Sequence, residues 1–246
     1  MIPTLPRLAG TIERRILVNC RVRPDVIAPW LPAPFRPQLV KGWAMAGICL
    51  IRMRGVRPRG LPEWCGLGSE NAAHRIAVEW DGASGTQQGV YIPRRDTDSA
   101  LNYLLGGRVF PGAHHRARFE VWESPNRFRV GFTSADGGAR VRFVGRVVDD
   151  WPAGSVFGSL AEASAFFVAG CCGWSPKRAG TGFEGMRLDC HGWRMEPLLA
   201  ERVDSGFFQN RGLFPAGSVE FDSAQLMRNI AHEWTVLKGM RDGNKA

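Results

Sequence analysis

The feature that most constrains the fold is a two-residue alternation of apolar and polar side chains. In residues 11–22 the apolar side of this alternation consists of Ile12, Ile16, Val18, Cys20 and Val22. Successive side chains of a strand point to opposite faces, so the pattern predicts a strand with one buried face and one mostly polar face. Residues 43–53 are almost entirely apolar, which predicts a central strand covered on both faces.

Three further alternating segments, residues 116–122, 127–133 and 140–148, are separated by the turn sequences SPN and SADGG. This spacing predicts an antiparallel meander. A short helix is predicted over residues 99–105, with Asp96, Thr97 or Asp98 as its cap, and another after the capping box SLAE at Ser159. Many strands with few short helices predict an α+β fold dominated by one antiparallel, partly barrel-like sheet. No repeat or linker divides the chain, so we expect one domain over residues 1–246, with a core of about residues 11–236.

Polar residues are densest in residues 89–121. There a short strand, residues 90–92, is expected to stop at Pro93, and the helix is expected to pack Leu101, Leu104 and Leu105 against the sheet. Many polar and charged side chains between apolar segments predict a binding site. The candidate binding residues are Tyr91, Arg95, Asp96, Asn102, Arg108 and His114, together with Glu79 on the preceding predicted strand.

Each candidate also has an ordinary structural interpretation. Asp96 beside two arginines could orient a guanidinium for a substrate carboxylate, but such a trio is more often a cap with a surface ion pair. Arg108 in apolar context indicates an anionic partner or a buried carboxylate. His114 and His115 are neighbours on a predicted strand, so only one of them can face a given cavity. A hydrogen-bonded core histidine is an equally good interpretation of either.

The net charge of +9 comes almost entirely from arginine. Arginine enrichment can indicate anion recognition. A GC-rich genome, which encodes arginine where other genomes encode lysine, would give the same composition. The arginines are scattered, lack interleaved surface aromatics and match no nucleic-acid motif, so we expect no nucleic-acid partner.

The six cysteines have no C-x-x-C pair, and no metal-ligand spacing is present, so we expect neither a metal site nor a cofactor. No signal peptide and no run of membrane-spanning length is found, which predicts a cytoplasmic protein with reduced thiols and no membrane contact. A homo-oligomer is among the open alternatives. Walker, G-x-G-x-x-G and G-x-S-x-G motifs are absent from the sequence.

Several blocks in one order carry a resemblance to a known family: RILVNCRVRPDVIAPWLPAPFRPQLVKGWAMAGICLIR, SENAAHRIAVEW, GVYIPRRDTDS, GGRVFPGAHHRARF, SVFGSLAEASAFF and SVEFDSAQLMRNIAHEW. Over about residues 11–236 the chain resembles the uncharacterised bacterial domain-of-unknown-function family 2071, which is grouped with the acetoacetate-decarboxylase-like proteins. This resemblance implies their fold and a central cavity.

A more distant likeness is to acetoacetate decarboxylase itself, through Gly89-Val90-Tyr91, Asp96 and Gly107-Arg108. Counted without gaps from Gly107-Arg108, the Schiff-base lysine of that enzyme falls on His115. No lysine lies between Lys41 and Lys177, and a Schiff base needs a primary amine. The resemblance therefore implies the fold and not the decarboxylase chemistry.

We expect a protein that binds a small anionic or carbonyl-bearing molecule in its cavity. Arg108 and Arg95 would hold the anion, and His115, which occupies the lysine position, would act as general acid or base if there is catalysis. The alternative is a non-catalytic binding or regulatory module of the same fold. Fold alone does not choose between an enzyme and a binding module.

Overall fold

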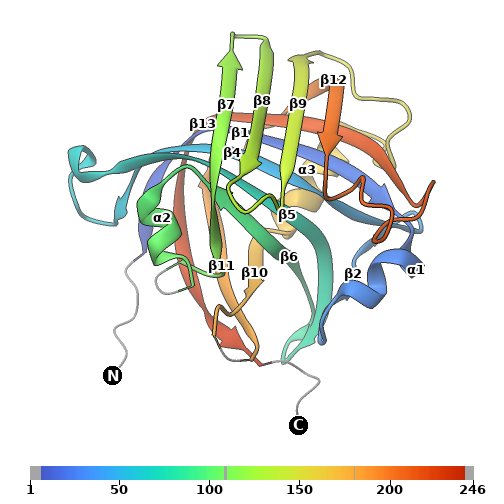
Figure 1. Cartoon of the computed structure of the whole chain (residues 1–246), viewed down its shortest axis with the longest axis horizontal. Coiled ribbons are helices and arrows are strands. Elements are labelled where there is room, and N and C mark those ends of the chain that lie inside the picture. Colours follow the sequence, from blue (N-terminus) through green and yellow to red (C-terminus); the bar gives the residue numbers. More distant parts are fainter. Residues whose placement is uncertain (1–6, 108–109, 180, 242–246) are drawn as a thin grey trace.

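The structure is a computed structural model that describes residues 7–107, 110–179 and 181–241 (Figure 1). The strands are β1 (Leu8–Val22), β2 (Arg36–Pro37), β3 (Leu39–Val40), β4 (Trp43–Pro58), β5 (Leu67–Gly82), β6 (Gly85–Thr97), β7 (His114–Glu123), β8 (Arg127–Ser134), β9 (Arg140–Val147), β10 (Cys172–Pro176), β11 (Phe183–His191), β12 (Glu196–Ser205) and β13 (Val219–Met240). The helices are α1 (Pro24–Ile27), α2 (Ala100–Leu105) and α3 (Leu160–Ala169), with 3-10 turns η1 (Ala28–Trp30) and η2 (Glu63–Cys65). None of the helices in these ranges is long and apolar enough to cross a membrane.

The described strands form one sheet of thirteen strands that closes on itself twice. One ring runs β6-β7-β8-β9-β12-β13-β1-β4-β5 and returns to β6. The second runs β11-β10-β6-β5-β4-β1-β13 and returns to β11. Five long strands, β13, β1, β4, β5 and β6, therefore belong to both rings. In Figure 1, β7, β8 and β9 stand on one side of these shared strands, and β10 and β11 lie on the other.

The long strand β13 serves both rings by pairing different halves with different partners. Residues 224–226 pair with β12, whereas residues 231–240 pair with β11. Asn229 lies between these halves with a φ of 53°, a left-handed conformation that asparagine tolerates better than most residues. This local turn of the backbone lets one strand change partners.

The sheet is mixed, which corrects the expectation of an antiparallel sheet. Strand β6 pairs in parallel with β7 and with β10. The connection from β6 to β7 is a crossover through α2, whereas the chain reaches β10 only after β7, β8, β9 and α3. The three-strand meander β7-β8-β9 is antiparallel as predicted.

The shared strands are buried on both faces, which corrects the prediction for residues 11–22. On one face, inside the first ring, lies a core that includes Ile16, Val18, Phe132 and Phe143. On the other face lies a second core built around Leu17 and covered by Phe167 of α3. The register of β1 against β4 shifts between Ile12 and Arg14, so Ile12 belongs to the second core and not to the side of Ile16.

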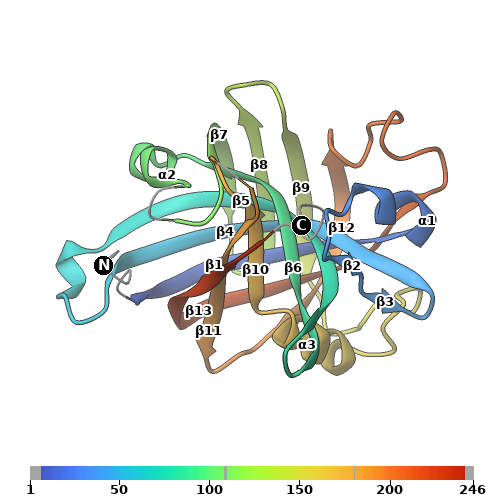
Figure 2. The same ribbon diagram turned by 90° about the horizontal axis from the view of Figure 1, so that it is seen from below.

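The two predicted helices are present, but only α3 packs as a cover. Ser159 caps α3 by accepting a hydrogen bond from the Glu162 amide, and the helix buries Ala163 and Phe167. Ser99, and none of the three preceding candidates, caps α2. The expectation that α2 packs its leucines against the sheet is wrong, because Leu101 and Leu104 are 42% and 53% exposed. Figure 2 shows α2 beside the end of the sheet, whereas α3 lies against its face.

Strand β6 continues past Pro93 to Thr97, contrary to the expected stop. The register against β5 shifts between His74 and Ile76, opposite the segment that holds Ile92 and Pro93. A proline is tolerated at such a bulge because its missing N–H removes no ladder hydrogen bond. The extension carries Arg94, Arg95 and Asp96 into the sheet.

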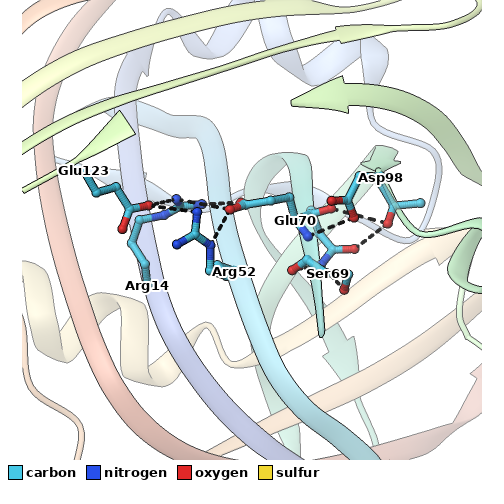
Figure 3. A network of polar contacts seen from close by, with 8 residues as sticks. Arg14, Arg52, Ser69, Glu70, Asp98 and Glu123 are labelled. Atoms are coloured by element: carbon cyan, nitrogen blue, oxygen red, sulfur yellow. Dashed lines mark hydrogen bonds and ion pairs between the residues drawn. The ribbon is translucent and has the colours of Figure 1, made fainter. Parts of the chain in front are cut away.

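A buried ion-pair network ties the first ring together (Figure 3). Arg14 of β1 is 1% exposed and contacts the carboxylates of Glu70 on β5 and Glu123 on β7. Arg52 of β4 contacts the same two carboxylates. Because Glu123 lies at the end of β7, the network holds the meander to the shared strands.

Replacing Arg14 by methionine should lower the free energy of unfolding by about 3 kcal/mol, because it leaves buried carboxylate charge short of a partner. Chemical denaturation measures the change. Arg23→Met, in the exposed pair with Asp25, is the control and should leave the free energy of unfolding nearly unchanged. Equal effects of the two substitutions would contradict a structural role for the network.

His74 makes the fold sensitive to acid. It is 1% exposed, packs against Phe207 at a ring-centroid distance of 4.9 Å, and neither ring nitrogen has a hydrogen-bond partner among the described residues. Burial, assisted by the positive charge of Arg94, lowers its pKa from 6.5 to about 4. Between these two values the unfolded chain binds a proton that the folded chain does not.

Stability should therefore be full above pH 6.5 and fall as the pH drops from 6.5 toward 4, with His74 contributing up to about 1.4 kcal/mol per pH unit. His74→Phe should make this fall shallower, and His191→Phe, at an exposed position, should not. Denaturation curves across this pH range test the difference. An unchanged slope in His74→Phe would rule out the assignment.

A candidate anion-binding pocket

A pocket of about 170 Å³ lies on the second face of the shared strands. Its wall comes from β1, β4, β5 and β6, from β10 and β11, from Phe167 of α3 and from the α2 region. Apolar side chains make up most of the wall, among them Ile51, Val90, Ile92, Met186 and Leu188. The polar side chains set into this apolar wall decide its chemistry.

Three arginines of the pocket wall have no carboxylate partner among the described residues: Arg15 of β1, Arg75 of β5 and Arg95 of β6. The Arg95 Nε donates to the Ser175 hydroxyl at 3.2 Å. One Arg75 amino group donates to the Asn19 side-chain oxygen, and the Arg75 Nε has no partner in the described part of the chain. The hydrogen bonds of the Arg15 side chain within the described chain go to sulfur, at the Cys49 Sγ and the Met227 Sδ.

The Arg75 and Arg95 guanidiniums stay charged although burial disfavours the charge. Burial lowers the pKa of Arg75 to about 10 and that of Arg95 to about 10. Both values lie well above neutral pH, so both side chains carry their charge there. A buried charge without a counterion costs several kcal/mol, so this arrangement is not explained by stability.

Aromatic rings provide part of the missing stabilisation. The Arg75 guanidinium lies 4.8 Å from the ring centre of Phe167, and that of Arg15 lies 5.7 Å from Trp193. Such cation–π contacts contribute about 1–2 kcal/mol when desolvated, which offsets only part of the cost of burial.

His114 enters the pocket beside Arg95, because β7 pairs in parallel with β6 so that these two residues are neighbours. Gly106 allows the close approach of the α2 end, since a Cβ there would lie 2.5 Å from the His114 Nδ1. Burial, followed by the charge of Arg95, lowers the pKa of His114 to about 3. The ring is therefore neutral at pH 7.

The tautomer of His114 follows from its hydrogen bond with the Gly112 backbone. Its Nδ1 lies 3.1 Å from the Gly112 carbonyl oxygen, which can only accept. In the neutral ring Nδ1 therefore carries the proton, and Nε2 presents a lone pair.

His115 points away from the pocket, because neighbouring side chains of a strand alternate. Its Nδ1 lies 2.8 Å from the Asp136 carboxylate. Asp136 also pairs with Arg94, and so does the fully buried Asp96. Asp96 reaches the pocket wall, but its charge is committed to Arg94 and not to Arg95.

The remaining candidates separate in the same way. Asn102 lines the pocket and donates to Asn71 and Ser69. Tyr91 packs in the core against Phe35, at 5.7 Å between ring centres, and is not among the lining residues. Glu79 pairs with Arg36 at 2.8 Å, also away from the pocket. Arg108 lies outside the described residues.

Arg15 and Arg75 were missed by the sequence analysis. Arg15 stands on the side of its strand expected to be mostly polar, and Arg75 lies inside the run AAHRIAV. An arginine inside such an apolar run is the signal that could have singled out Arg75. Arg15 gives no comparable signal, because the bulge after Ile12 sets which face it occupies.

Comparison with solved structures shows the fold. The chain is similar to an acetoacetate decarboxylase from Legionella pneumophila, with 12% identity, a TM-score of 0.62, and coverage of 96% of this chain and 89% of that one. It is similar to the enduracididine biosynthesis enzyme MppR complexed with pyruvate, with 13% identity, a TM-score of 0.63, and coverage of 100% and 93%. An acetoacetate decarboxylase-like enzyme from Sphingomonas wittichii matches with 13% identity, a TM-score of 0.60, and coverage of 96% and 93%.

No curated protein matches the sequence. Residues 10–224 match the family DUF2071, described as an uncharacterized conserved protein. That match spans most of the chain and agrees with the acetoacetate decarboxylase-like fold. The chain is therefore a member of the DUF2071 family, built on the acetoacetate decarboxylase-like fold.

Proposed function

We propose that the protein binds a small carboxylate in the pocket, with Arg15, Arg75 and Arg95 as the positive groups. The observation that carries this proposal is the absence of a carboxylate partner for any of the three within the described ranges. A bound anion would supply the missing counterion, and charge-assisted hydrogen bonds to guanidinium are among the stronger polar contacts in proteins.

The size and lining of the pocket support a ligand with one small apolar body. A dry cavity of about 150 Å³ accommodates benzene, and the pocket here has a volume of about 170 Å³. A carboxylate attached to a single ring or a short branched chain suits this space. Benzoate is a suitable probe because its ring matches the apolar wall and its carboxylate matches the arginines.

His114 supports a second contact with the ligand. Its Nε2 lone pair accepts a hydrogen bond, so a hydroxyl or enol next to the carboxylate would be recognised. With its pKa lowered to about 3 by burial and by Arg95, His114 is a weak general base. An anion beside Arg95 would offset the positive charge that helps to lower this pKa, and would raise it.

Acid–base catalysis at His114 is therefore the second candidate function, in place of the role first given to His115. The lone pair at Nε2 beside Arg95 favours it, because a base next to an anion site is the arrangement needed to move a proton near a carboxylate. A non-catalytic binding module remains the simpler proposal, since it needs only the arginines.

Benzoate at saturating concentration should raise the Tm of the protein by about 2 °C or more, because it binds the folded state only. Arg95→Met should abolish most of this increase. Without ligand its Tm should equal or exceed that of the wild type, because a buried unpaired charge has been removed. Differential scanning fluorimetry measures both effects.

The matched control is Arg118→Met, which removes the same charge from an exposed position on β7 and should keep the benzoate response. A loss of stability in ligand-free Arg95→Met as large as that expected for Arg14→Met would show that Arg95 is structural. A benzoate response that survives in Arg95→Met would also count against the proposal.

Treatment with borohydride in the presence of pyruvate or acetoacetate should leave no adduct on the protein, because no lysine is among the lining residues of the described chain. Intact-protein mass spectrometry provides the measurement, with an acetoacetate decarboxylase as the positive control. A mass increase that maps to a lysine would contradict this prediction and show that the protein forms a Schiff base.

A further inference from the structure

Cys49 lines the same pocket as the three arginines that have no carboxylate partner in the described chain. It stands on β4 and lines the pocket, with 8% of its surface exposed. The strand register places Cys49, Ala73 and Arg95 in one row across β4, β5 and β6. Because alanine is small, the long Arg95 side chain can extend over it toward the sulfur.

Each of the three arginines acts on this sulfur. The Arg15 Nε donates to the Cys49 Sγ at 3.4 Å. Against the effect of burial, Cys49 raises the pKa of Arg75 and that of Arg95, which places it within electrostatic reach of both. An anion held by these guanidiniums would therefore lie against the Cys49 sulfur.

We infer that Cys49 is a covalent attachment site for small carboxylates that carry an electrophilic carbon. This inference rests on the proposed anion-binding function and adds a substrate class to it. With an α,β-unsaturated carboxylate, the sulfur would bond to the β-carbon and the thiol proton would end on the α-carbon. With iodoacetate, the sulfur would bond to carbon, iodide would leave, and the thiol proton would pass to solvent.

The selectivity would come from the bound carboxylate. Positive charge around a cleft raises the local concentration of an anion by about tenfold or more. Iodoacetate and iodoacetamide deliver the same electrophilic carbon, but only iodoacetate carries a negative charge. Their rate ratio at one cysteine therefore reports whether that cysteine lies in an anion site.

The other cysteines provide internal references in the same molecule. Cys65 is exposed and has no such surroundings. Cys171 also lines the pocket, and a hydrogen bond from Cys172 lowers its pKa to about 6, so it should react with both reagents. Burial raises the pKa of Cys20 to about 12, which makes it a poor nucleophile.

The experiment treats the reduced full-length chain with each reagent at neutral pH and follows every cysteine by peptide mass spectrometry. The rate ratio of iodoacetate to iodoacetamide should be about tenfold or more higher at Cys49 than at Cys65. Benzoate should slow labelling of Cys49 by iodoacetate. Arg95→Met should lower the iodoacetate rate at Cys49 by a larger factor than the iodoacetamide rate, whereas Arg118→Met should change neither.

Two results would overturn the inference: a Cys49 that is inert to both reagents, or a rate ratio at Cys49 equal to that at Cys65. The benzoate-induced Tm increase in Cys49→Ser separates this failure from failure of the proposed function. If the increase persists while Cys49 fails the labelling test, the anion site stands and only the covalent step is lost. If both fail, the proposed function is lost as well.

Discussion

The constraint on which the structure depends is that five long strands are buried on both faces. Most buried polar side chains on these strands find a partner inside the protein or face the pocket, and His74, packed against aromatic rings without a hydrogen-bond partner in the described chain, is an exception. Two consecutive pairs of arginines show both outcomes. Arg14 and Arg94 turn to one side and bind carboxylates, whereas Arg15 and Arg95 turn to the pocket and bind none among the described residues. The neighbouring residues His114 and His115 also face opposite sides: His115 contacts Asp136, and His114 lies in the pocket wall.

This division separates charges that hold the fold from charges available to a ligand. The network of Arg14, Arg52, Glu70 and Glu123 connects four strands, and each of its two arginines pairs with both carboxylates. Within the ranges that the structure describes, the pocket arginines have sulfur, hydroxyl and amide partners, together with aromatic rings. The same residue type therefore serves stability on one face and, as we propose, recognition on the other.

The sequence predicted the elements better than their arrangement. Alternation located β1 and the meander, and the capping pattern at Ser159 located α3, because these signals are local. The closure of two rings could not be predicted, since it depends on Asn229 and on which half of β13 meets which partner. Bulges had the same effect on a smaller scale: the shift after Ile12 decides which face Arg15 occupies, and the shift near His74 keeps Pro93 within its strand.

The candidate site was predicted in part, for a physical reason. Arg95, Asn102 and His114 lie in the polar segment that composition singled out, and all three line the pocket. His115 was preferred over His114 by counting along an ungapped alignment, and one residue on a strand reverses the face. Arg75 and Arg15 come from distant strands, so only the folded sheet brings them to Cys49. Our proposal differs from decarboxylase chemistry because it needs arginines that bind a carboxylate and does not need a lysine that forms a Schiff base.

A crystal structure of the protein with a bromine-labelled carboxylate such as 4-bromobenzoate, measured at the bromine absorption edge, tests the central claim most directly. Our account predicts an anomalous peak inside the pocket, with the carboxylate bound by Arg95 and by Arg15 or Arg75, and with Arg14 and Arg94 still paired to protein carboxylates. An empty pocket at saturating ligand, with its arginines paired to carboxylates of the protein itself, would contradict the account.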